Sequence, residues 1–163
     1  MIYCFFVIAH DRRLLFHLGI TGNPTSAWVS QQLREALPYG SAAEYLIFDR
    51  AANFNAEVVS TIQSFGIEPM RASFRSPSQN GVAERFVGNC RRDLLDHVIV
   101  LNQRHLRRPM TECIRYYHDD RTHLGLDKQT RMGREVVRVA GPDSRVISMP
   151  RFGGLHHRYD LAA

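Results

Sequence analysis

Two acidic residues have the chemistry and the setting to hold a divalent cation. Asp49 ends the apolar run Tyr45–Phe48, which predicts a short buried strand that delivers a carboxylate at its C-terminal tip. Glu84 follows after 34 intervening residues and falls near the start of a long helical pattern. A divalent cation with oxygen ligands needs such carboxylates aimed at one cleft. For each residue alone, the simpler interpretation is a strand-terminal Asp that starts a turn, or a solvated Glu on a helix face.

The helix that carries Glu84 is predicted over about Pro77–Val100. Ser76 as N-cap, with Gln79 three residues later, fits a capping box. Glu84 lies about 200° around the helix from the first residue of the apolar stripe, so it points away from that stripe. The stripe consists of Val82, Phe86, Cys90 and Leu94, and the side of Glu84 also holds Gly81, Gly88 and Arg91. A side of this kind is either solvated or open to a nucleic-acid backbone, with the arginine placed to neutralise phosphate.

Apolar runs predict the strands that accompany the Asp49 strand. Ile2–Ala9 is uninterrupted and apolar, so we expect a strand with both faces covered. His10–Arg13 predicts a turn, after which Leu14–Ile20 returns antiparallel. Ile67–Ala72 predicts a short strand after the second helix. Together with the helices, these runs predict an α/β fold.

Two helices are predicted between these strands. Asn23 and Pro24 fit the N-cap and the first position of a helix that ends at Pro38. Apolar residues at helical spacing over Phe54–Phe65 predict the second helix, and Gly66 fits the position just past its end.

Four segments, in their order and spacing, resemble the catalytic core of the retroviral-integrase and insertion-sequence transposase superfamily: Phe48–Phe54, Ser64–Ile67, Arg75–Arg85 and Tyr116–Leu126. The resemblance covers residues 1 to about 130. It implies a ribonuclease H-like mixed sheet flanked by helices, and an Asp-Asp-Glu active site that uses Mg²⁺ or Mn²⁺. Asp49 corresponds to the second acid and Glu84 to the third, each as a catalytic residue and a metal ligand. Ala51 stands where the family often has Gly.

The first acid of the family lies on a strand that precedes the one predicted over Ile2–Ala9. The chain begins at Met1, so we expect an N-terminally truncated core that lacks this strand and its Asp. Asp11 is no replacement, because it falls in the turn His10–Arg13, where Asp is common for reasons of backbone hydrogen bonding. Unpaired strand edges favour aggregation, so we expect poor solubility or no strand transfer from the chain expressed alone.

Charge and composition fit a soluble domain and permit, without proving, an anionic partner. The 163 residues carry a net charge of +5, with 44% hydrophobic and 23% charged residues. Eight arginines fall between residues 71 and 108, and arginine suits bidentate phosphate contacts, although a GC-rich genome produces the same bias. The candidate DNA-binding residues are Asn80, Arg85, Arg91 and Arg92.

A further helix is predicted over about Gln103–His118, and Pro109 is expected to break it, kink it or mark its true start. The basic cluster of Arg104, His105, Arg107 and Arg108 is either a solvated face or a DNA contact. These segments complete a predicted core of residues 1–126, which is followed by a short basic C-terminal tail of residues 127–163.

The tail contains two short runs, Val146–Met149 and Leu155–Tyr159, which flank a Gly-Gly pair and predict a small hairpin. Adjacent His156 and His157 would point to opposite faces of a strand, which makes shared metal chelation poor. The tail contacts DNA or a protein partner, or it is a loosely ordered terminus.

The three cysteines, Cys4, Cys90 and Cys113, show no paired metal-binding spacing and are expected to be buried, reduced thiols. The N-terminal apolar run is too short to span a bilayer. We therefore expect no membrane association and a cytoplasmic location in a bacterium, at the nucleoid when the chain is bound to DNA.

The residues and the resemblance together predict DNA transposition or integration by metal-dependent phosphodiester strand transfer, here as an incomplete catalytic core. The alternative is a non-catalytic DNA-binding or multimerising transposase remnant, and a ribonuclease H-like nuclease outside transposition is a weaker third. The expected partners are DNA and a homo-oligomer with full-length transposase, without a small-molecule substrate. No helix-turn-helix pattern is present, so recognition of a specific terminal sequence is not expected.

Overall fold

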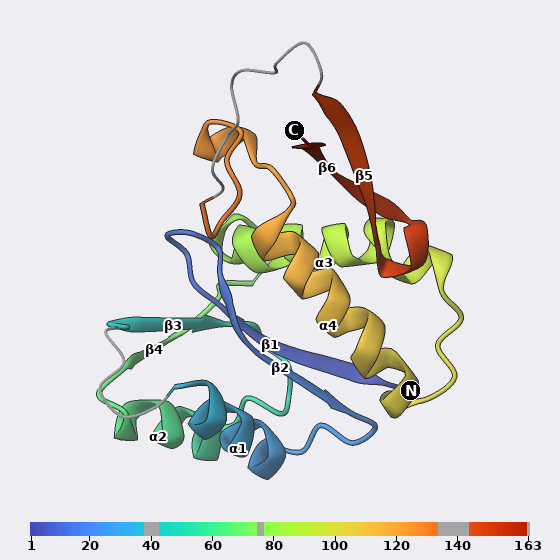
Figure 1. The fold of residues 1–163 in the computed structure, drawn as a ribbon. Coiled ribbons are helices and arrows are strands. Elements are labelled where there is room, and N and C mark those ends of the chain that lie inside the picture. The colour runs from blue at the N-terminus through green and yellow to red at the C-terminus, as the bar shows by residue number, and fades with distance from the viewer. Residues whose placement is uncertain (38–42, 75–76, 134–143, 163) are drawn as a thin grey trace. The chain divides into compact units, whose positions relative to one another are not determined.

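The computed structural model describes residues 1–37, 43–74, 77–133 and 144–162 (Figure 1). The chain forms two compact units, Met1–Val87 (unit 1) and Gly88–Ala163 (unit 2). The boundary between them falls inside helix α3 (Gly81–Asp93). The boundary between the two compact units therefore lies well before residue 126. The division into a core of residues 1–126 and a tail of residues 127–163 concerns function and stays a prediction.

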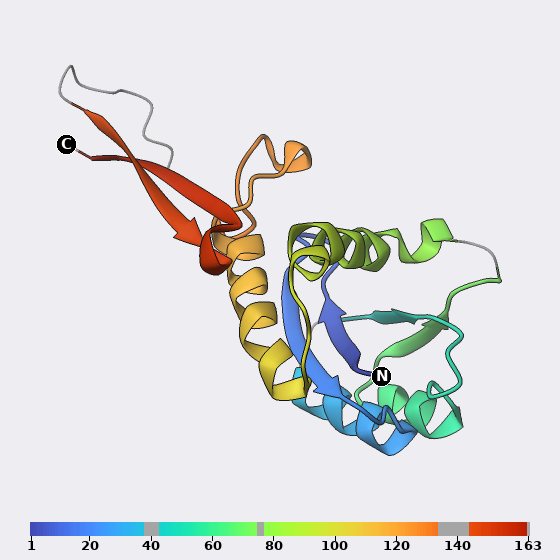
Figure 2. The ribbon, with the colours of Figure 1, turned by 90° about the vertical axis from the view of Figure 1, so that its right-hand side faces the viewer.

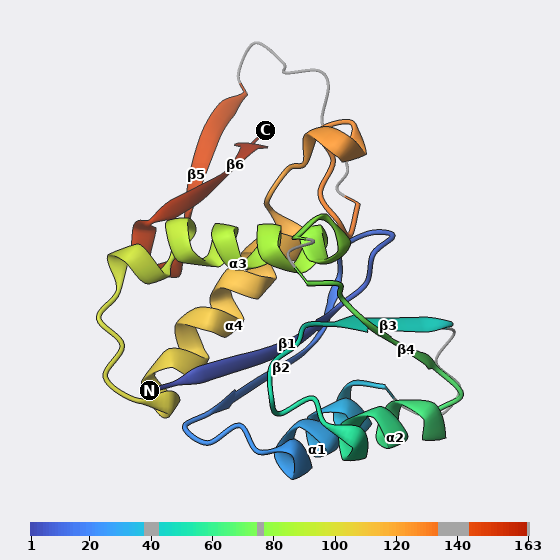
Figure 3. The same cartoon turned by 180° about the vertical axis from the view of Figure 1, so that it is seen from behind.

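Unit 1 is a mixed α/β unit in which two helices pack against each other beside short strands (Figures 1 and 2). The helices α1 and α2 lie on the same side of the strands in all three views (Figure 3). In chain order the elements are β1 (Tyr3–Ile8), β2 (Leu15–Thr21), α1 (Ser26–Ala36), β3 (Tyr45–Phe48), α2 (Ala56–Ser64), β4 (Glu68–Arg71) and η1 (Pro77–Asn80), after which α3 begins.

The strands of unit 1 form two separate ladders. β1 and β2 pair antiparallel, from Tyr3 opposite Thr21 to a register shift between Val7 and Ile8. β3 and β4 pair parallel, with Tyr45 opposite Glu68 at the first position. Within the described residues no ladder joins β1 to β3. The prediction of an α/β unit with both strand directions is confirmed, but the strands do not form one continuous mixed sheet.

Strand β1 departs from the expectation that both of its faces are covered. Tyr3 and Cys4 are exposed, while Val7 is buried. The exposed residues lie at the start of β1 and the buried one near its end, so only the later part of the strand packs into the core, with Val7 in it and Phe5 against it. Exposure of Cys4 also corrects its assignment as a buried thiol, whereas Cys90 and Cys113 are buried and all three cysteines are free.

The core of unit 1 is apolar, and one face of each helix supplies its most deeply buried aliphatic side chains. Val29 and Leu33 of α1 and Val58 and Ile62 of α2 are at most 1% exposed. Their spacing of four residues places each pair on one side of its helix. Burying each such side chain stabilises the fold by roughly 1.5–3 kcal/mol. This packing fixes the strands that carry the candidate site.

The ends of these helices test the predicted caps. Helix α1 begins after Thr25, whose hydroxyl accepts the N–H of Trp28 at 3.2 Å, so Asn23 is not the cap. The N–H of Asn23 instead binds the side chain of Thr21 in the preceding turn. Gly66, with φ of +75°, lies just past the end of α2 as predicted, because an L side chain rarely adopts that backbone conformation.

The predicted helix over Pro77–Val100 is three shorter elements. A 3₁₀ turn, η1, precedes α3, and a second one, η2 (Leu95–His97), follows it. The side chain of His97 bonds the carbonyl of Arg92 and so satisfies an acceptor in the last turn of α3. Gln79 accepts the N–H of Ser73 at 2.6 Å. Ser76, the predicted partner of Gln79 in a capping box, lies outside the described residues.

Unit 2 continues from α3 into a long helix and a hairpin. Helix α4 (Gln103–Asp119) runs through Pro109 without a break, so the predicted break or later start is wrong. The loss of one backbone donor at Pro109 is offset by the buried face of the helix, which consists of Leu106, Met110, Cys113 and Tyr117. The predicted hairpin is confirmed as β5 (Arg145–Arg151) and β6 (His156–Ala162). The short 3₁₀ elements η3 (Leu124–Leu126) and η4 (Phe152–Gly154) precede and join these strands, respectively.

Among the described residues, no helix is both long enough and apolar enough to span a membrane.

Candidate active site

Asp49 is the first residue after β3, at the C-terminal end of the strand as predicted. The strand ladder continues to this point, because the N–H of Ala72 donates to the carbonyl of Phe48 at 2.9 Å. The Asp49 side chain is exposed, and its Oδ1 accepts the N–H of Ala51 at 3.0 Å. This is the turn bond of the simpler interpretation, and it also fixes the direction in which the carboxylate points.

The loop that follows Asp49 is held from several sides. Arg50 donates through Nε to the carbonyl of Ala72 at 3.0 Å, and the N–H of Phe54 donates to the carbonyl of Ala51 at 3.0 Å. The ring of Phe54 stacks on Phe48 with the centroids 5.1 Å apart. The Arg71 guanidinium lies over the ring of Phe48, 5.6 Å from its centroid. Asp49 therefore lies on a braced loop, which suits a residue that has to hold a ligand in a fixed place.

Glu84 lies in the first turn of α3 and its side chain is exposed. Two residues later, Phe86 is 1% exposed and packs edge-on against Phe6 of β1, with ring centroids 4.9 Å apart. The predicted direction of Glu84, away from the buried stripe, agrees with this exposure. An acid in the first turn is also favourable to the helix dipole, which is the simpler account of the residue.

The two acids follow elements that contact each other. β3, which ends one residue before Asp49, contacts η1, the 3₁₀ turn that leads into α3 and Glu84. Figures 2 and 3 show the end of β3 on the same side of unit 1 as the start of α3. In the part of the chain that the structure describes, no three His, Cys, Asp or Glu side chains gather as a metal site. A shared metal position between Asp49 and Glu84 stays a prediction.

The candidate DNA-binding residues divide between the two units. In unit 1, Asn80 is half-buried at the end of η1 and Arg85 is exposed. In unit 2, Arg91 is exposed, while the guanidinium of Arg92 donates to the side chain of Asn89 at 3.0 Å. Arg92 thus has a structural partner already, and contact of these residues with DNA stays a prediction.

Comparison with known proteins adds a family and a fold. Residues 65–130 match the family model of the integrase core domain, a range that includes Glu84 and excludes Asp49. A chain of the cryo-EM structure of the simian T-cell lymphotropic virus intasome in complex with PP2A regulatory subunit B56 gamma is similar in fold, with a TM-score of 0.60 at 14% identity. The match covers 98% of this chain and 64% of that chain. Curated proteins gave no match.

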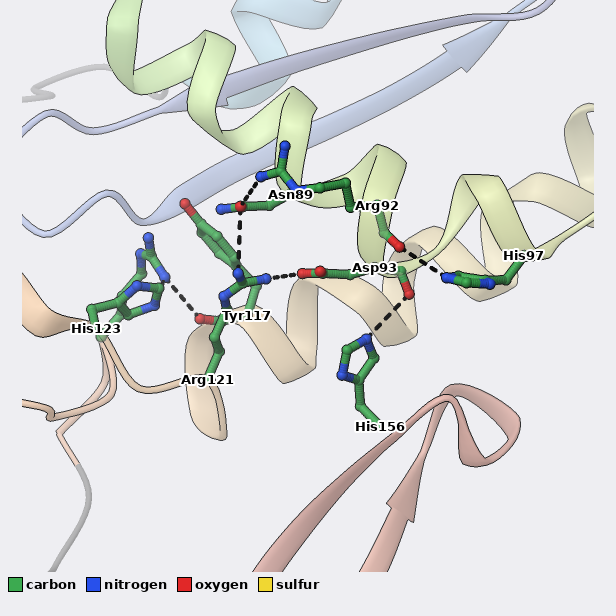
Figure 4. A network of polar contacts seen from close by, with 9 residues as sticks. Asn89, Arg92, Asp93, His97, Tyr117, Arg121, His123 and His156 are labelled. Carbon is green, nitrogen blue, oxygen red and sulfur yellow. Dashed lines mark hydrogen bonds and ion pairs between the residues drawn. The ribbon is translucent and has the colours of Figure 1, made fainter.

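The resemblance to an integrase core is confirmed. The matched range also explains the segment Tyr116–Leu126, the last of the motifs that carry the resemblance. In this chain the segment includes the end of α4 and contributes to a polar network inside unit 2 (Figure 4).

The polar network of unit 2 centres on Arg121. Its guanidinium forms an ion pair with Asp93 and donates to the side chain of Asn89 at 3.4 Å. His156 of the hairpin bonds the backbone carbonyl of Asp93 at 3.3 Å (Figure 4). Burial is the main cause that lowers the pKa of His156, and the charge of Arg121 adds to it. The network joins the end of α3, the end of α4 and the hairpin.

A second pair of contacts follows the same segment. Arg131 is 1% exposed, lies over the ring of Tyr117 at 3.4 Å from its centroid, and donates to the Tyr117 carbonyl at 3.1 Å. It also contacts the side chain of His123. The side chain of Asp120 is 3% exposed and forms ion pairs with Arg151 and Arg158, one from each strand of the hairpin. Residues of the segment Tyr116–Leu126 therefore make contacts that stabilise unit 2. The sequence pattern at these residues did not predict their distant partners.

Proposed function

We propose that this chain acts in DNA transposition or integration, by metal-dependent phosphodiester strand transfer on a ribonuclease H-like core. The observation that carries the proposal is the braced carboxylate of Asp49 at the end of β3, beside the turn that leads to Glu84. The match of residues 65–130 to the integrase core domain supports the same reaction class.

The donor chemistry of the two acids fits Mg²⁺ or Mn²⁺. Both ions take hard oxygen ligands and prefer few from protein, which leaves positions for phosphate and water. Asp49 uses Oδ1 in the turn and, among the described residues, Oδ2 has no partner. Asp49 and Glu84 would hold the ion, which, when bound, activates an oxygen nucleophile and stabilises the leaving 3′ oxygen.

The remaining residues of the proposed site orient DNA. Arg85 and Arg91, both exposed on α3, would neutralise phosphates, and Asn80 and Arg92 are the other candidate DNA contacts. The described residues supply two acids at the site, so we propose an incomplete catalytic core that holds metal weakly. A non-catalytic DNA-binding or multimerising role is the second candidate, and the same lack of a three-ligand group favours it.

The proposal extends to the partners of the chain. The similar intasome chain supports DNA and a homo-oligomer with full-length transposase as partners, and a bacterial cytoplasmic location follows from that role. This chain corresponds to 64% of the length of that chain, so these statements concern an assembly of which it is one part.

The test uses the purified chain with a supercoiled plasmid and Mg²⁺ or Mn²⁺. Asp49→Asn keeps an oxygen for the Ala51 N–H but removes the charge, and Glu84→Gln removes the other carboxylate. Any metal-dependent nicking that the incomplete core supports should fall by about 100-fold or more in each variant, because metal ligation supplies several kcal/mol of transition-state stabilisation. Asp11→Asn, which changes an exposed acid in the β1–β2 turn, is the matched control and should leave nicking unchanged.

Manganese binding, measured by calorimetry, separates the two candidates. Loss of Mn²⁺ binding in Asp49→Asn and Glu84→Gln supports the metal site even where nicking is slow. DNA binding without nicking and without metal binding in the unaltered chain supports the non-catalytic role. Equal nicking by the chain and its Asp49→Asn variant would refute the site.

A further inference from the structure

Helix α4 exposes a row of arginines on the face opposite its buried side. Arg104, Arg107, Arg108 and Arg115 are all exposed, whereas Leu106, Met110, Cys113 and Tyr117 are buried. At about 100° per residue, the four arginines fall within about 100° of one another and are centred opposite the buried residues. We refer to these four side chains as the α4 arginine row.

Most of the positive charge of the row is not neutralised by an ion pair. Arg108 pairs with Glu112 at 3.1 Å, and its side chain is still 87% exposed. Arg104, Arg107 and Arg115 have no side-chain partner among the described residues. Asp119, one turn beyond Arg115, is the other acid on this face, so the first two turns of α4 are the most positive.

Three arginines that join elements of unit 2 give the contrast. Arg121 pairs with Asp93, and both Arg151 and Arg158 pair with Asp120. Unit 2 therefore provides carboxylates for the arginines that join its elements, and leaves the α4 arginine row almost without them.

The placement of the row is unfavourable for the helix itself. Positive charges near a helix N-terminus oppose the dipole, and α4 has no acid in its first turn. Like charges three and four residues apart, such as Arg104 with Arg107 and Arg108, also destabilise a helix by a few tenths of a kcal/mol per pair. A bound anion would relieve both effects.

The start of helix α4, from which the row projects, is held by two hydrogen bonds. The side chain of Asn102 accepts the N–H of His105 at 2.8 Å, and the ring of His105 accepts the N–H of Leu101 at 3.4 Å. These two bonds cap the start of α4 reciprocally. The arginines therefore project from a rigid helix rather than from a loop, which reduces the ordering cost of binding.

We propose that the α4 arginine row binds the phosphate backbone of duplex DNA, outside the site of Asp49 and Glu84. From Arg104 to Arg115 the helix rises about 16 Å. Duplex DNA carries one charge per roughly 1.7 Å of its axis, so several phosphates fall within that reach. Guanidinium groups match phosphate oxygens in pairs. The choice of DNA as the polyanion rests on the proposed function, whereas the row itself rests on unit 2 alone.

The contact is with the backbone and is indifferent to base sequence. Phosphate contacts set position and orientation, and base-edge contacts would be needed to read sequence. Exposed Ile99 (83%) and Leu101 (74%), just before α4, would suit a protein surface instead, so binding of a second copy is the competing outcome.

The experiment measures binding of a fluorescent duplex of random sequence by anisotropy, in EDTA, over a range of salt concentrations. The variant is Arg104→Gln with Arg107→Gln, since glutamine keeps the side chain long and suits a helix. The control is Arg12→Gln with Arg34→Gln, which removes the same charge from exposed positions outside the row and outside the basic tail.

We expect the row variant to lower affinity about 10- to 100-fold at 0.1 M salt, and to reduce the log–log salt slope by about 1.8. The control pair should change the slope by much less. An unchanged slope in the row variant, or an equal loss in the control pair, would overturn the proposal. Sedimentation of each protein without DNA identifies the competing outcome, because loss of self-association in the row variant alone assigns the face to a second copy.

The result is independent of the proposed reaction. The anisotropy measurement is made in EDTA, which removes the metal that strand transfer needs, so its outcome does not depend on that reaction. If the chain binds DNA through the row but does not nick it, the result counts against strand transfer only. If the chain nicks DNA but its binding does not depend on the row, the result counts against the row only.

Discussion

Units 1 and 2 are stabilised by different kinds of buried contact. The most deeply buried side chains of unit 1 include Val29, Val58 and Ile62, each 0% exposed. In unit 2, by contrast, Arg131 is 1% exposed over an aromatic ring, and the Asp120 side chain is 3% exposed between two arginines.

The difference follows from what each unit has to position. Unit 1 holds the braced Asp49 and the helix start at Glu84 on an aliphatic core, which is insensitive to salt and pH. Unit 2 attaches a two-stranded hairpin, and an isolated hairpin has too little apolar area to be stable on its own. Ion pairs and aromatic contacts with α4 supply the attachment.

The largest expected effect is in unit 1. Ile62→Ala should lower the free energy of unfolding by about 2–5 kcal/mol, because it leaves a cavity in a fully buried position. Trp28, the single tryptophan, lies in α1 of the same unit, so its fluorescence in urea reports this loss. The loss should be the same at low and high salt, and a strong dependence on salt would contradict an aliphatic origin.

A smaller effect is expected in unit 2. Asp120→Asn removes the charge that holds Arg151 and Arg158, and should cost about 2–3 kcal/mol, below the range for fully buried pairs because both arginines are about 30% exposed. Hydrogen exchange of the β5 and β6 amides should accelerate while that of α1 stays unchanged. The matched control is Asp160→Asn, which removes a partly exposed partner of Arg158 and should cost under about 1 kcal/mol. Equal acceleration in both variants would refute the special role of Asp120.

The smallest effect is a dependence on pH in unit 2. Burial lowers the pKa of His118 and of His156 below the ordinary value for histidine, and nearby arginines, Arg131 and Arg121 respectively, add to this. The unfolded chain then binds more protons than the folded one, so stability decreases as pH falls below about 6.5.

The two histidines can be tested directly. His118→Gln and His156→Gln should each flatten the decline in hydrogen-exchange protection of α4 between about pH 7 and pH 5. His10→Gln, at an exposed turn of unit 1, is the control and should leave the profile as it is. A profile that steepens in either unit 2 variant would show the opposite sign of the linkage.

Sequence patterns predicted the parts of this fold that depend on near neighbours. The spacing of Val58 and Ile62 predicted a buried helix face, and Gly66 predicted the end of that helix. Pro109 was misjudged, because the low helix propensity of one residue was outweighed by burial of one face of α4.

The candidate site divides in the same way. The positions of Asp49 after a strand and Glu84 in a helix turn follow from local patterns and from the resemblance to integrase cores. The bond from Arg50 to the Ala72 carbonyl joins residues far apart in sequence, and no periodicity encodes such a partner. The same holds for Asp120 and its two arginines, which the sequence shows only as separate charges.

The outer edge of β1 has a consequence for handling the protein. Within the described residues this strand pairs only with β2, so no strand takes up the backbone donors and acceptors along its second edge, which includes the exposed residues Tyr3 and Cys4. An edge of this kind is a template for another strand. Loss of monomer should therefore rise with protein concentration, and a reducing agent should prevent only the later cross-linking through Cys4 and leave the strand pairing itself in place.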